Sequence, residues 1–450
     1  MTARSTLRPA AVTGRIRMRI RRQWIVLLLA GLAGLASPAS PARPASSTSP
    51  TAPASLASAA SPARPASLAA PTGPAVLGGD ARADQLPGAF QATLDSLCQS
   101  CSVPGATAAY VLPDGTTGCA ASGLADLESA TPMTPRARML SASIGKTYVA
   151  ATVIALALEG ALDLDAPIAR WMGERPWFGR LPNRDSITVR HLLTHTSGLA
   201  DHVHLQRFQT EVARRWPEGD NAFTPEGLVA CVLEEPPLFA PGAGWAYSDT
   251  GYILLGLIIE AVTGRPCFAE MSERFTRPLG LTATSPSDRR DLEGLVPGYT
   301  TADNPFGFPR KSIGDDGRLA WHPGLEWTGG GWVSSSLDLA RWGAALFGGN
   351  AMPGNYLGQL LRPVPVSADS DDLCYGAGVA IYRSGPFGPV YGHGGWIPGY
   401  VSSLRHYPEH GITIAFQINS DAAAEQNPEM VPDMEASLAR VVLANLEGAP

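Results

Sequence analysis

The sequence predicts a mixed α/β (α+β) fold. In it, one antiparallel sheet is built from the N- and C-terminal segments, helices flank the sheet, and a mainly helical lobe is inserted at about residues 160–330. Strand-like segments bounded by turn residues lie near both ends of the folded part, and helical patterns fill the stretch between them. The chain has 450 residues, 45% hydrophobic and 16% charged, which is typical of a globular protein. A functional site is expected in the groove between sheet and lobe.

The strands are predicted from alternating and turn-bounded segments. Residues 105–126, "GATAAYVLPDGTTGCAASGLAD", indicate two strands joined at Asp114-Gly115, a strong hairpin signal. The C-terminal part contains three further strand-like segments, "GPVYGHGG", "GYVSSLRHYP" and "GITIAFQINS". Pairing of these two groups would give the single sheet.

The helices are predicted from apolar periodicity and end signals. A long apolar helix is expected from about Ser143 to Glu159, ended by Gly160. Another is expected in "SLDLARWGAALFGG", with Ser336 as N-cap, and the final "PEMVPDMEASLARVVLANLEG" indicates an amphipathic helix. The lobe is expected to contain helices in "TVRHLLTHTSGL", "TPEGLVACVLEE", "TGYILLGLIIEAVTG" and "CFAEMSERFTRPLG".

The first 84 residues are expected to lie outside the folded domain at 85–445. Five arginines between positions 15 and 22 precede a thirteen-residue apolar run, Trp24 to Ala36, the layout of a secretory signal peptide over residues 1–36. An uncleaved signal anchor is the alternative, and only then is membrane attachment expected. Residues 37–84 are rich in Ala, Pro and Ser and repeat "SPARPAS", which indicates a disordered linker. The predicted localisation is therefore extracytoplasmic, periplasmic or secreted.

Charge and cysteine content narrow the classes of partner. Without residues 1–36, which hold seven arginines and no acid, 27 basic and 40 acidic side chains remain, a net charge of −13. An acidic chain without basic runs is a poor nucleic-acid binder. The six cysteines permit disulfides in an exported protein, but their pairing stays open. Cys98 and Cys101 form a C-x-x-C, for which we favour a structural role over redox chemistry.

One lysine stands out in a chain that writes almost every positive charge as arginine. Of 34 basic side chains only Lys146 and Lys311 are lysines. Arginine keeps its proton in proteins, whereas a buried lysine can be shifted toward neutrality. Lys146 follows Ser143 by three residues, so the two side chains share one helix face. Ser143 also lies at the helix N-terminus, where a developing anion is stabilised.

Two further motifs complete a constellation around this S-x-x-K. "GWAYSDTGYILLG" places Tyr247 and Asp249 before an apolar helix, and "VYGHGGWIPGY" places His393 and two glycines on a strand. The ordered set S-x-x-K, Y-x-N variant and H-x-G resembles the serine β-lactamase and penicillin-binding protein superfamily. The flanking "LLTHTSGL" and "GGGWVSSSLDLARW" resemble its class C branch, which includes D-alanyl-D-alanine carboxypeptidases and esterases. The resemblance covers about residues 85–445 and implies a β-lactamase/transpeptidase-like fold.

The resemblance also implies roles for the site residues. Ser143 would be the nucleophile that becomes acylated, and Lys146 and Tyr247 a proton-transfer pair. Tyr247 would be the base for the attack and for the later deacylation by water, with its pKa lowered by Lys146. His393 would orient Tyr247 or, when protonated, bind a substrate carboxylate. The backbone N–H of Trp396 would be the second oxyanion donor, and Gly395 would let the substrate lie close to the strand.

Two departures from the family pattern bear on the substrate. Asp249 replaces the usual Asn, so it accepts hydrogen bonds but does not donate them when ionised, and it places a negative charge beside Lys146. His393 instead of Lys weakens attraction for a substrate carboxylate. Efficient β-lactamase activity is therefore not expected, while peptidase and esterase chemistry stay open.

The sequence therefore predicts an exported serine hydrolase acting on a peptide, ester or β-lactam carbonyl. A D-alanyl-D-alanine carboxypeptidase-like activity is preferred, and an esterase or β-lactamase is the alternative. A non-catalytic cell-envelope binding protein is the alternative of another class. "HLLTH" lacks the Glu of a zincin motif, and neither a G-x-S-x-G elbow nor a Gly-rich phosphate loop occurs. Neither a metal nor a cofactor is expected.

Overall fold

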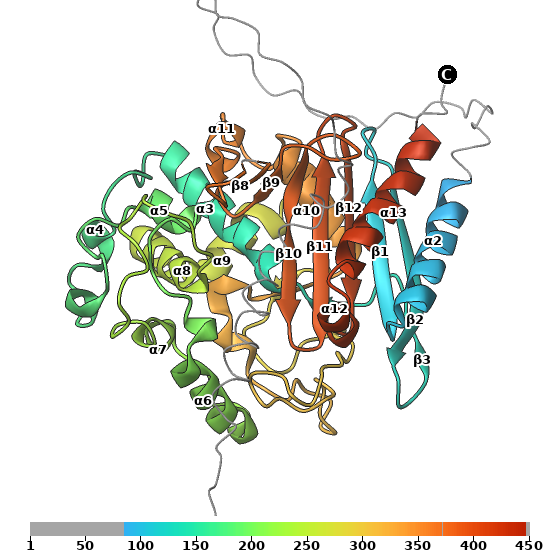
Figure 1. Cartoon of the computed structure of the whole chain (residues 1–450), viewed down its shortest axis with the longest axis horizontal. Helices are drawn as coiled ribbons and strands as arrows, with labels where there is room; N and C mark the ends of the chain where they lie inside the picture. The colour runs from blue at the N-terminus through green and yellow to red at the C-terminus, as the bar shows by residue number, and fades with distance from the viewer. Residues whose placement is uncertain (1–84, 371, 447–450) are drawn as a thin grey trace, which may run out of the picture.

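A nine-stranded antiparallel sheet joins the two ends of the folded chain in the computed structural model, which describes residues 85–370 and 372–446 (Figure 1). The predicted signal peptide and linker lie outside the described residues. The strand order is β3-β2-β1-β12-β11-β10-β9-β8-β7. In chain order the strands are β1 Gly105–Val111, β2 Thr117–Asp126, β3 Thr131–Pro132, β7 Val364–Pro365, β8 Leu373–Tyr375, β9 Ala380–Tyr382, β10 Val390–Ile397, β11 Tyr400–Tyr407 and β12 Ile412–Ile418.

The central pair β1 and β12 explains why the ends of the chain meet. Their register runs from Ala106 opposite Ile418 to Val111 opposite Thr413. Successive side chains of a strand point to opposite faces, and every residue of β1 is buried, so this strand is mostly apolar and its one threonine, Thr107, is hydrogen-bonded to Ser336. The predicted hairpin is confirmed: β1 and β2 pair across a turn in which Gly115 has a φ of +85°.

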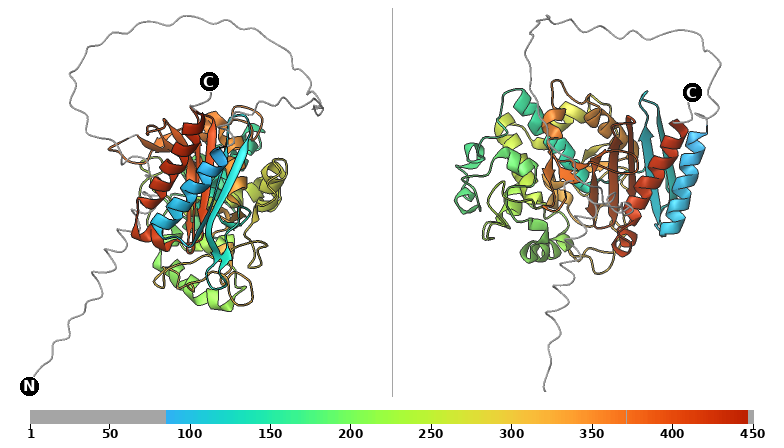
Figure 2. Two further views of the ribbon diagram at one scale, coloured as in Figure 1. Left: turned by 90° about the vertical axis from the view of Figure 1, so that its right-hand side faces the viewer. Right: turned by 45° about the horizontal axis from the view of Figure 1, so that its top comes forward.

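Two terminal helices cover one face of the sheet. Helix α2 (Leu86–Cys101) and helix α13 (Met430–Leu446) pack side by side (Figure 2). The α2 stripe Leu86, Phe90, Leu94 and Cys98 is buried at helical spacing, and Phe90 meets Tyr110 of β1 edge to face at 4.9 Å. Helix α13 was predicted from the sequence, whereas α2 was not.

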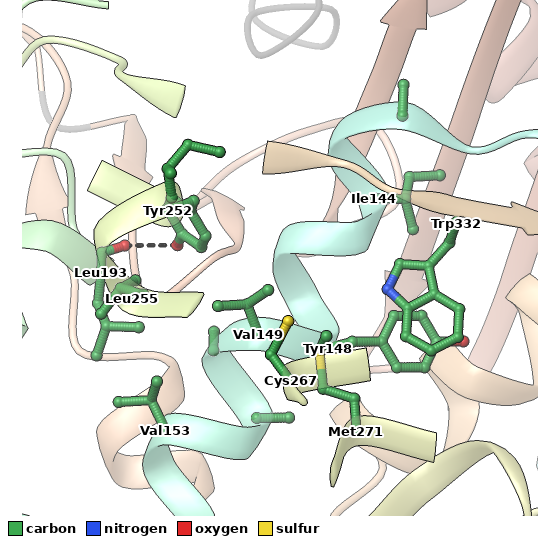
Figure 3. Packing of buried hydrophobic residues seen from close by; sticks show 14 of the residues in the cluster. Ile144, Tyr148, Val149, Val153, Leu193, Tyr252, Leu255, Cys267, Met271 and Trp332 are labelled. Atoms are coloured by element: carbon green, nitrogen blue, oxygen red, sulfur yellow. Dashed lines mark hydrogen bonds between the residues drawn. The ribbon is translucent and has the colours of Figure 1, made fainter. Parts of the chain in front are cut away.

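Helices α3 (Lys146–Leu158), α8 (Asp249–Thr263) and α10 (Ser336–Phe347) contribute to the larger core on the other side of the sheet. The ring of Tyr148 stacks on that of Trp332 at 4.9 Å (Figure 3). It also stacks on the ring of Trp342 at 4.1 Å. Helix α10 is capped by Ser335, whose side chain accepts from the Asp338 N–H, so the predicted N-cap at Ser336 is wrong by one residue.

The inserted lobe lies to one side of the sheet (Figure 1). Its helices are α4 Ala169–Met172, α5 Val189–Leu193, α6 Gln206–Arg215, α7 Pro225–Ala230, α8 and α9 Cys267–Met271, the last followed by a π-helical turn, Ser272–Thr276. A second, three-stranded sheet has the order β4-β6-β5, with β4 Met139–Leu140, β6 Trp332–Ser334 and β5 Ser285–Pro286. Short helices α11 Leu357–Leu360 and α12 Ala422–Gln426 and several 3₁₀ turns, Ala142–Gly145, Phe178–Arg180, His202–His204, Trp216–Glu218, Pro323–Leu325 and Trp327–Gly329, complete the described chain. The predicted fold class is confirmed.

The C-x-x-C cysteines lie in the last turn of α2. Cys98 is buried, and burial raises the pKa of its thiol to about 11. Reactive C-x-x-C thiols have lowered pKa values, so this arrangement fits the structural role predicted for the motif. Among the described residues no single helix is long and apolar enough to cross a membrane, although α8 and α9 with its π-turn pass together as a pair bent by 79°.

Candidate active site

Ser143 lies at the one point where a buried segment reaches the surface. Residues 139–156 are all buried except Ser143, which is partly exposed. Ser143 sits in the 3₁₀ turn Ala142–Gly145, directly before α3. Ala142 has a φ of +47°, a left-handed conformation that is rare for alanine and that accompanies this abrupt turn. The predicted helix is thus present, and its first turn presents the serine.

Lys146 is fully buried beneath this turn and makes three polar contacts. Its Nζ donates to Ser143 Oγ at 3.0 Å and to the backbone oxygen of Gly329, and it lies 2.5 Å from Asp249 Oδ1. The exposed fractions of the Lys146 and Asp249 side chains are 0% and 20%. Ser143 and Lys146 therefore meet as the S-x-x-K spacing predicts.

Three consecutive glycines, Gly329 to Gly331, pack against the turn that carries Ser143. A Cβ on Gly145 would overlap the backbone oxygen of Gly330, so only glycine fits between the nucleophile and the lysine. Gly329, in the same run, supplies the oxygen that accepts from Lys146. The "GGGW" segment quoted from the sequence therefore positions the lysine.

Tyr247 lies in the loop that enters α8, Asp249 is the first residue of that helix, and His195 fixes the loop. The Ser248 N–H donates to His195 Nδ1 at 3.2 Å, and the His195 ring lies 4.2 Å from that of Tyr247. Burial, together with the charge of Lys146, lowers the pKa of His195 well below its ordinary value. His195 is therefore a neutral support, a role that the sequence analysis did not assign to it.

Tyr247 does not have the lowered pKa that was predicted. Burial and then the carboxylate of Asp249 raise its pKa well above the ordinary value of a phenol, against a smaller effect of its hydrogen bond with Ser143. The Lys146 Nζ lies 4.9 Å from the Tyr247 ring centroid, but this cation is already paired with Asp249. The predicted direction is wrong, and Tyr247 in this site is a neutral hydroxyl.

Two carboxyl groups that the sequence analysis missed flank Asp249. Asp201 Oδ1 accepts from the Asp249 N–H at 3.3 Å, and burial and the Asp249 charge raise the pKa of Asp201 well above its usual value. The same two causes raise the pKa of Glu326 to about 8. Both residues stand in segments beside quoted motifs, Asp201 after "THTSGL" and Glu326 before the glycines, which is the only signal the sequence offers for them.

His393 lies deeper than predicted. It is 2% exposed, its Nε2 lies 2.8 Å from the Tyr375 hydroxyl, and its Nδ1 lies 2.5 Å from Gly394 O. Burial and the Lys146 charge lower its pKa to about 3. His393 is thus neutral at physiological pH, and the expected capture of a substrate carboxylate by its protonated form is wrong. The ring centroid of His393 lies 6.2 Å from that of Tyr247, and both rings contact Tyr375.

Gly395 and Trp396 follow on the same strand, β10. A Cβ on Gly395 would overlap Ser141 O and Ser402 Oγ, so the space is occupied by the segment that leads to Ser143. Gly395 therefore allows β10 to approach this segment, in place of the close approach of a substrate that was predicted. Trp396 is half-buried opposite Val401, and its role as an oxyanion donor stays a prediction.

The two histidines of "HLLTH" do not point to one site. His191 Nδ1 accepts from the Thr188 N–H at 3.2 Å and caps α5, whereas His195 supports the Tyr247 loop. No group of three or more His, Cys, Asp or Glu side chains that could hold a metal ion occurs in the part of the chain that the structure describes.

Comparisons with known proteins agree with this geometry. A family model described as Beta-lactamase matches residues 90–435. Penicillin-binding protein 4* of Bacillus subtilis is 26% identical over 312 residues, and esterase EstB of Burkholderia gladioli is 37% identical over 168 residues. These matches cover 67% and 36% of this chain, and the chain spans only 65% and 41% of the two relatives.

Solved structures match over more of their length. A D-stereospecific amidohydrolase from Streptomyces sp. has a TM-score of 0.65 and 30% identity, with 77% of this chain and 97% of that chain covered. The D-amino acid amidase from Ochrobactrum anthropi SV3 has a TM-score of 0.67 and 27% identity, with 80% and 99% covered. Since the family model matches most of the chain, and these structures share its fold, the chain belongs to the β-lactamase family of serine hydrolases.

Proposed function

We propose that the chain is an exported hydrolase that forms an acyl-enzyme at Ser143 with a peptide or ester carbonyl. One observation carries the proposal: the only partly exposed side chain of residues 139–156 is a serine, and its hydroxyl lies 3.0 Å from the buried amine of Lys146. A serine beside a group able to move its proton is the arrangement required of a covalent nucleophile.

Neighbouring groups would assist this reaction. Tyr247, a neutral hydroxyl hydrogen-bonded to Ser143, would donate a hydrogen bond to the leaving atom. Ser143 lies at the N-terminal end of α3, so its own N–H and the helix dipole would stabilise the developing oxyanion, together with the predicted N–H of Trp396.

The first substrate class that we propose is a peptide or amide of a D-amino acid, hydrolysed in the manner of a D-alanyl-D-alanine carboxypeptidase. Its support is the similarity to a penicillin-binding protein and to a D-amino acid amidase. These names belong to the relatives, and the identities of 26% and 27% leave the substrate of this chain to experiment.

An ester or an amide without a terminal carboxylate is the second candidate, and the charges of the site favour it. The Lys146 cation is already paired with Asp249, and His393 is neutral and buried. His393 therefore lacks the charge that was predicted to bind the carboxylate of a D-alanyl-D-alanine peptide or a β-lactam, and the Lys146 charge is already compensated. The match to an esterase agrees with this second candidate.

The test is intact mass of the purified protein after brief incubation with p-nitrophenyl acetate and, separately, with benzylpenicillin, beside the Ser143→Ala variant. We expect an acetyl adduct and a burst of p-nitrophenol from the wild type only. A penicillin adduct, or hydrolysed drug, would favour the carboxypeptidase-like class, and reaction with the ester alone would favour the second. No adduct and no turnover with either would leave the non-catalytic binding protein.

Export is the remaining part of the proposal and is tested separately. Expression with residues 1–36 intact, in a bacterial host, should give a periplasmic or secreted protein whose N-terminus lies near residue 37. Intact mass and cell fractionation measure both. A full-length product in the membrane would instead support the signal anchor.

A further inference from the structure

The geometry points to Asp249 as the group that takes a proton from Lys146 and so makes this amine the base for Ser143. This inference rests on the proposed function, since it assigns a step in acylation of Ser143. The family motif has an amide at this position, and an amide oxygen does not accept a proton from an ammonium ion. A carboxylate does, and here it lies 2.5 Å from Lys146 Nζ.

The problem that Asp249 solves is the lack of another base at Ser143. An ammonium on Lys146 donates to Ser143 Oγ and does not accept its proton. Tyr247 is held as a neutral phenol because burial and the Asp249 charge raise its pKa. His393 is a neutral ring, but its Nε2 is engaged by the Tyr375 hydroxyl. The remaining group in direct contact with Lys146 that is able to receive a proton is Asp249.

The step that we propose converts an ion pair into a neutral pair at a buried position. Lys146 is fully buried, and a low-dielectric environment disfavours separated charges. Burial and the Asp249 charge raise the pKa values of Asp201 and Glu326, so neither adds a second negative charge that would hold Lys146 as an ammonium ion. The titratable groups that face Asp249 from the packed elements are Lys146 of α3, Asp201 and His202 of the loop before α6, Tyr247, Tyr252 of α8, Glu326 and Tyr375 of β8.

The step balances without any further reagent. The proton on Lys146 Nζ moves to Asp249 Oδ1, which leaves an amine and a carboxylic acid. Ser143 Oγ attacks the carbonyl carbon, its proton passes to Nζ, and the carbonyl π electrons move to the oxygen. When the oxyanion reforms the carbonyl, the bond to the leaving atom breaks and that atom takes the proton from Nζ. Water then attacks the acyl carbon and its proton passes to Nζ, and as the acyl bond breaks Nζ returns a proton to Ser143 Oγ. Asp249 finally returns its proton to Nζ.

The experiment measures the acylation rate with p-nitrophenyl acetate from pH 6 to 10 for the wild type and Asp249→Asn. General-base catalysis contributes about 10²–10⁴-fold, so we expect a loss of about 100-fold or more at pH 7 in the variant. Because its Lys146 must lose the proton to bulk water, the rate should then rise about tenfold for each pH unit, while the wild-type profile is flatter. A merely structural defect would lower the rate equally at every pH.

Two further variants keep the test decisive. Asp165 lies away from the site, its side chain is 63% exposed, and its carboxylate pairs with Arg190. The acylation rate of Asp165→Asn should match that of the wild type. If Asp249→Asn does not fold, Asp249→Ala is assayed with added formate, which should restore activity at pH 7, whereas formamide should not. Formate rescue would not follow from a role in packing.

The outcomes separate this inference from the proposed function. A wild type that shows no Ser143-dependent burst overturns both. A wild type that acylates while Asp249→Asn equals or exceeds it across the pH range overturns the inference alone, because the amide of the family motif then suffices. A pH-dependent loss in Asp249→Asn, or formate rescue of Asp249→Ala, supports it.

Discussion

Two buried ion pairs lie in different parts of this molecule, and they differ in the basic residue. Under α13, Arg405 of β11 pairs with Glu435 at 2.9 Å, with side chains 2% and 1% exposed. At the site, Lys146 pairs with Asp249 at 2.5 Å. The chain uses arginine for 32 of its 34 basic side chains, so lysine at the second pair is a departure from its own habit.

The surroundings explain the difference. Arg405 donates to Leu404 O, its guanidinium lies 5.3 Å from the Tyr382 ring centroid, and Ser403 donates to Glu435 at 2.6 Å, so each partner is held by neutral groups. Lys146 instead touches a serine hydroxyl and a carboxylate, between which a proton can travel. At these two pairs, arginine stands where only charge is needed, and lysine stands where the proposed step moves a proton.

Exchanging the residue type at the site should have the largest effect. Lys146→Arg keeps the positive charge but removes the group that releases and regains a proton. We expect kcat/KM with p-nitrophenyl acetate to fall by about 10³–10⁴-fold, the upper part of the range for general-base catalysis. The thermal unfolding midpoint, measured alongside, should stay close to that of the wild type. Turnover like that of the wild type would contradict the distinction between the two pairs.

Breaking the other pair should affect stability and leave catalysis intact. Glu435→Ala leaves the Arg405 charge buried without its carboxylate, and the loss of one partner of a buried pair typically costs about 3–5 kcal/mol. Urea unfolding should show a lower midpoint with an unchanged slope. Active-site titration with the ester should give the same rate per folded molecule. A large fall in that rate would show that the sheet face beneath α13 is coupled to the site.

Part of this comparison was accessible from the sequence. The strand and helix patterns predicted the fold class. The S-x-x-K spacing and the Y-x-N variant that contains Asp249 predicted that Ser143, Lys146, Tyr247 and Asp249 lie in one site. Local patterns did not show α2, which directly follows a long tract rich in Ala, Pro and Ser.

The rest depends on burial and on contacts between distant segments. The neutral state of His393 arises from its depth behind Tyr375, and the raised pKa of Tyr247 arises from burial beside Asp249. Glu326 and Asp201 reach Asp249 from loops that are separated from it by 77 and 48 positions. No spacing rule within one helix or strand predicts contacts between such distant segments. The protonation states of these side chains therefore follow only from the structure.

Replacing arginine by lysine at the Arg405–Glu435 pair is the reverse of Lys146→Arg. Arg405→Lys keeps the charge toward Glu435 but loses the forked geometry that also reaches Leu404 O. Hydrogen bonds to charged groups are worth about 1.5–3 kcal/mol, and we expect a loss of stability in that range. The kcat/KM for the ester should not change. If Arg405→Lys is as stable as the wild type, the choice of arginine at this pair needs another reason.

The smallest expected effect concerns the acid beside the catalytic pair. Burial and the Asp249 charge raise the pKa of Glu326 to about 8, above the value of about 4.5 for an exposed Glu. The folded state therefore binds more protons than the unfolded state between these values, so the contribution of Glu326 to stability is complete below pH 4.5 and is lost as the pH rises through about 8. Glu326→Gln cannot ionise, so its advantage over the wild type in thermal unfolding midpoint should grow from pH 5 to pH 8.5.

The difference in thermal unfolding midpoint between wild type and Glu326→Gln, taken at each pH, removes the effect of every other titrating group. This matters because His393, with its pKa lowered to about 3, acts in the opposite direction below pH 6.5. Glu435→Gln, measured over the same pH range, is the corresponding variant at the Arg405–Glu435 pair. Parallel curves for wild type and Glu326→Gln would mean that Glu326 is ionised throughout. Asp249 would then face a second negative charge, and the transfer of a proton from Lys146 to Asp249 would have to proceed beside the carboxylate of Glu326.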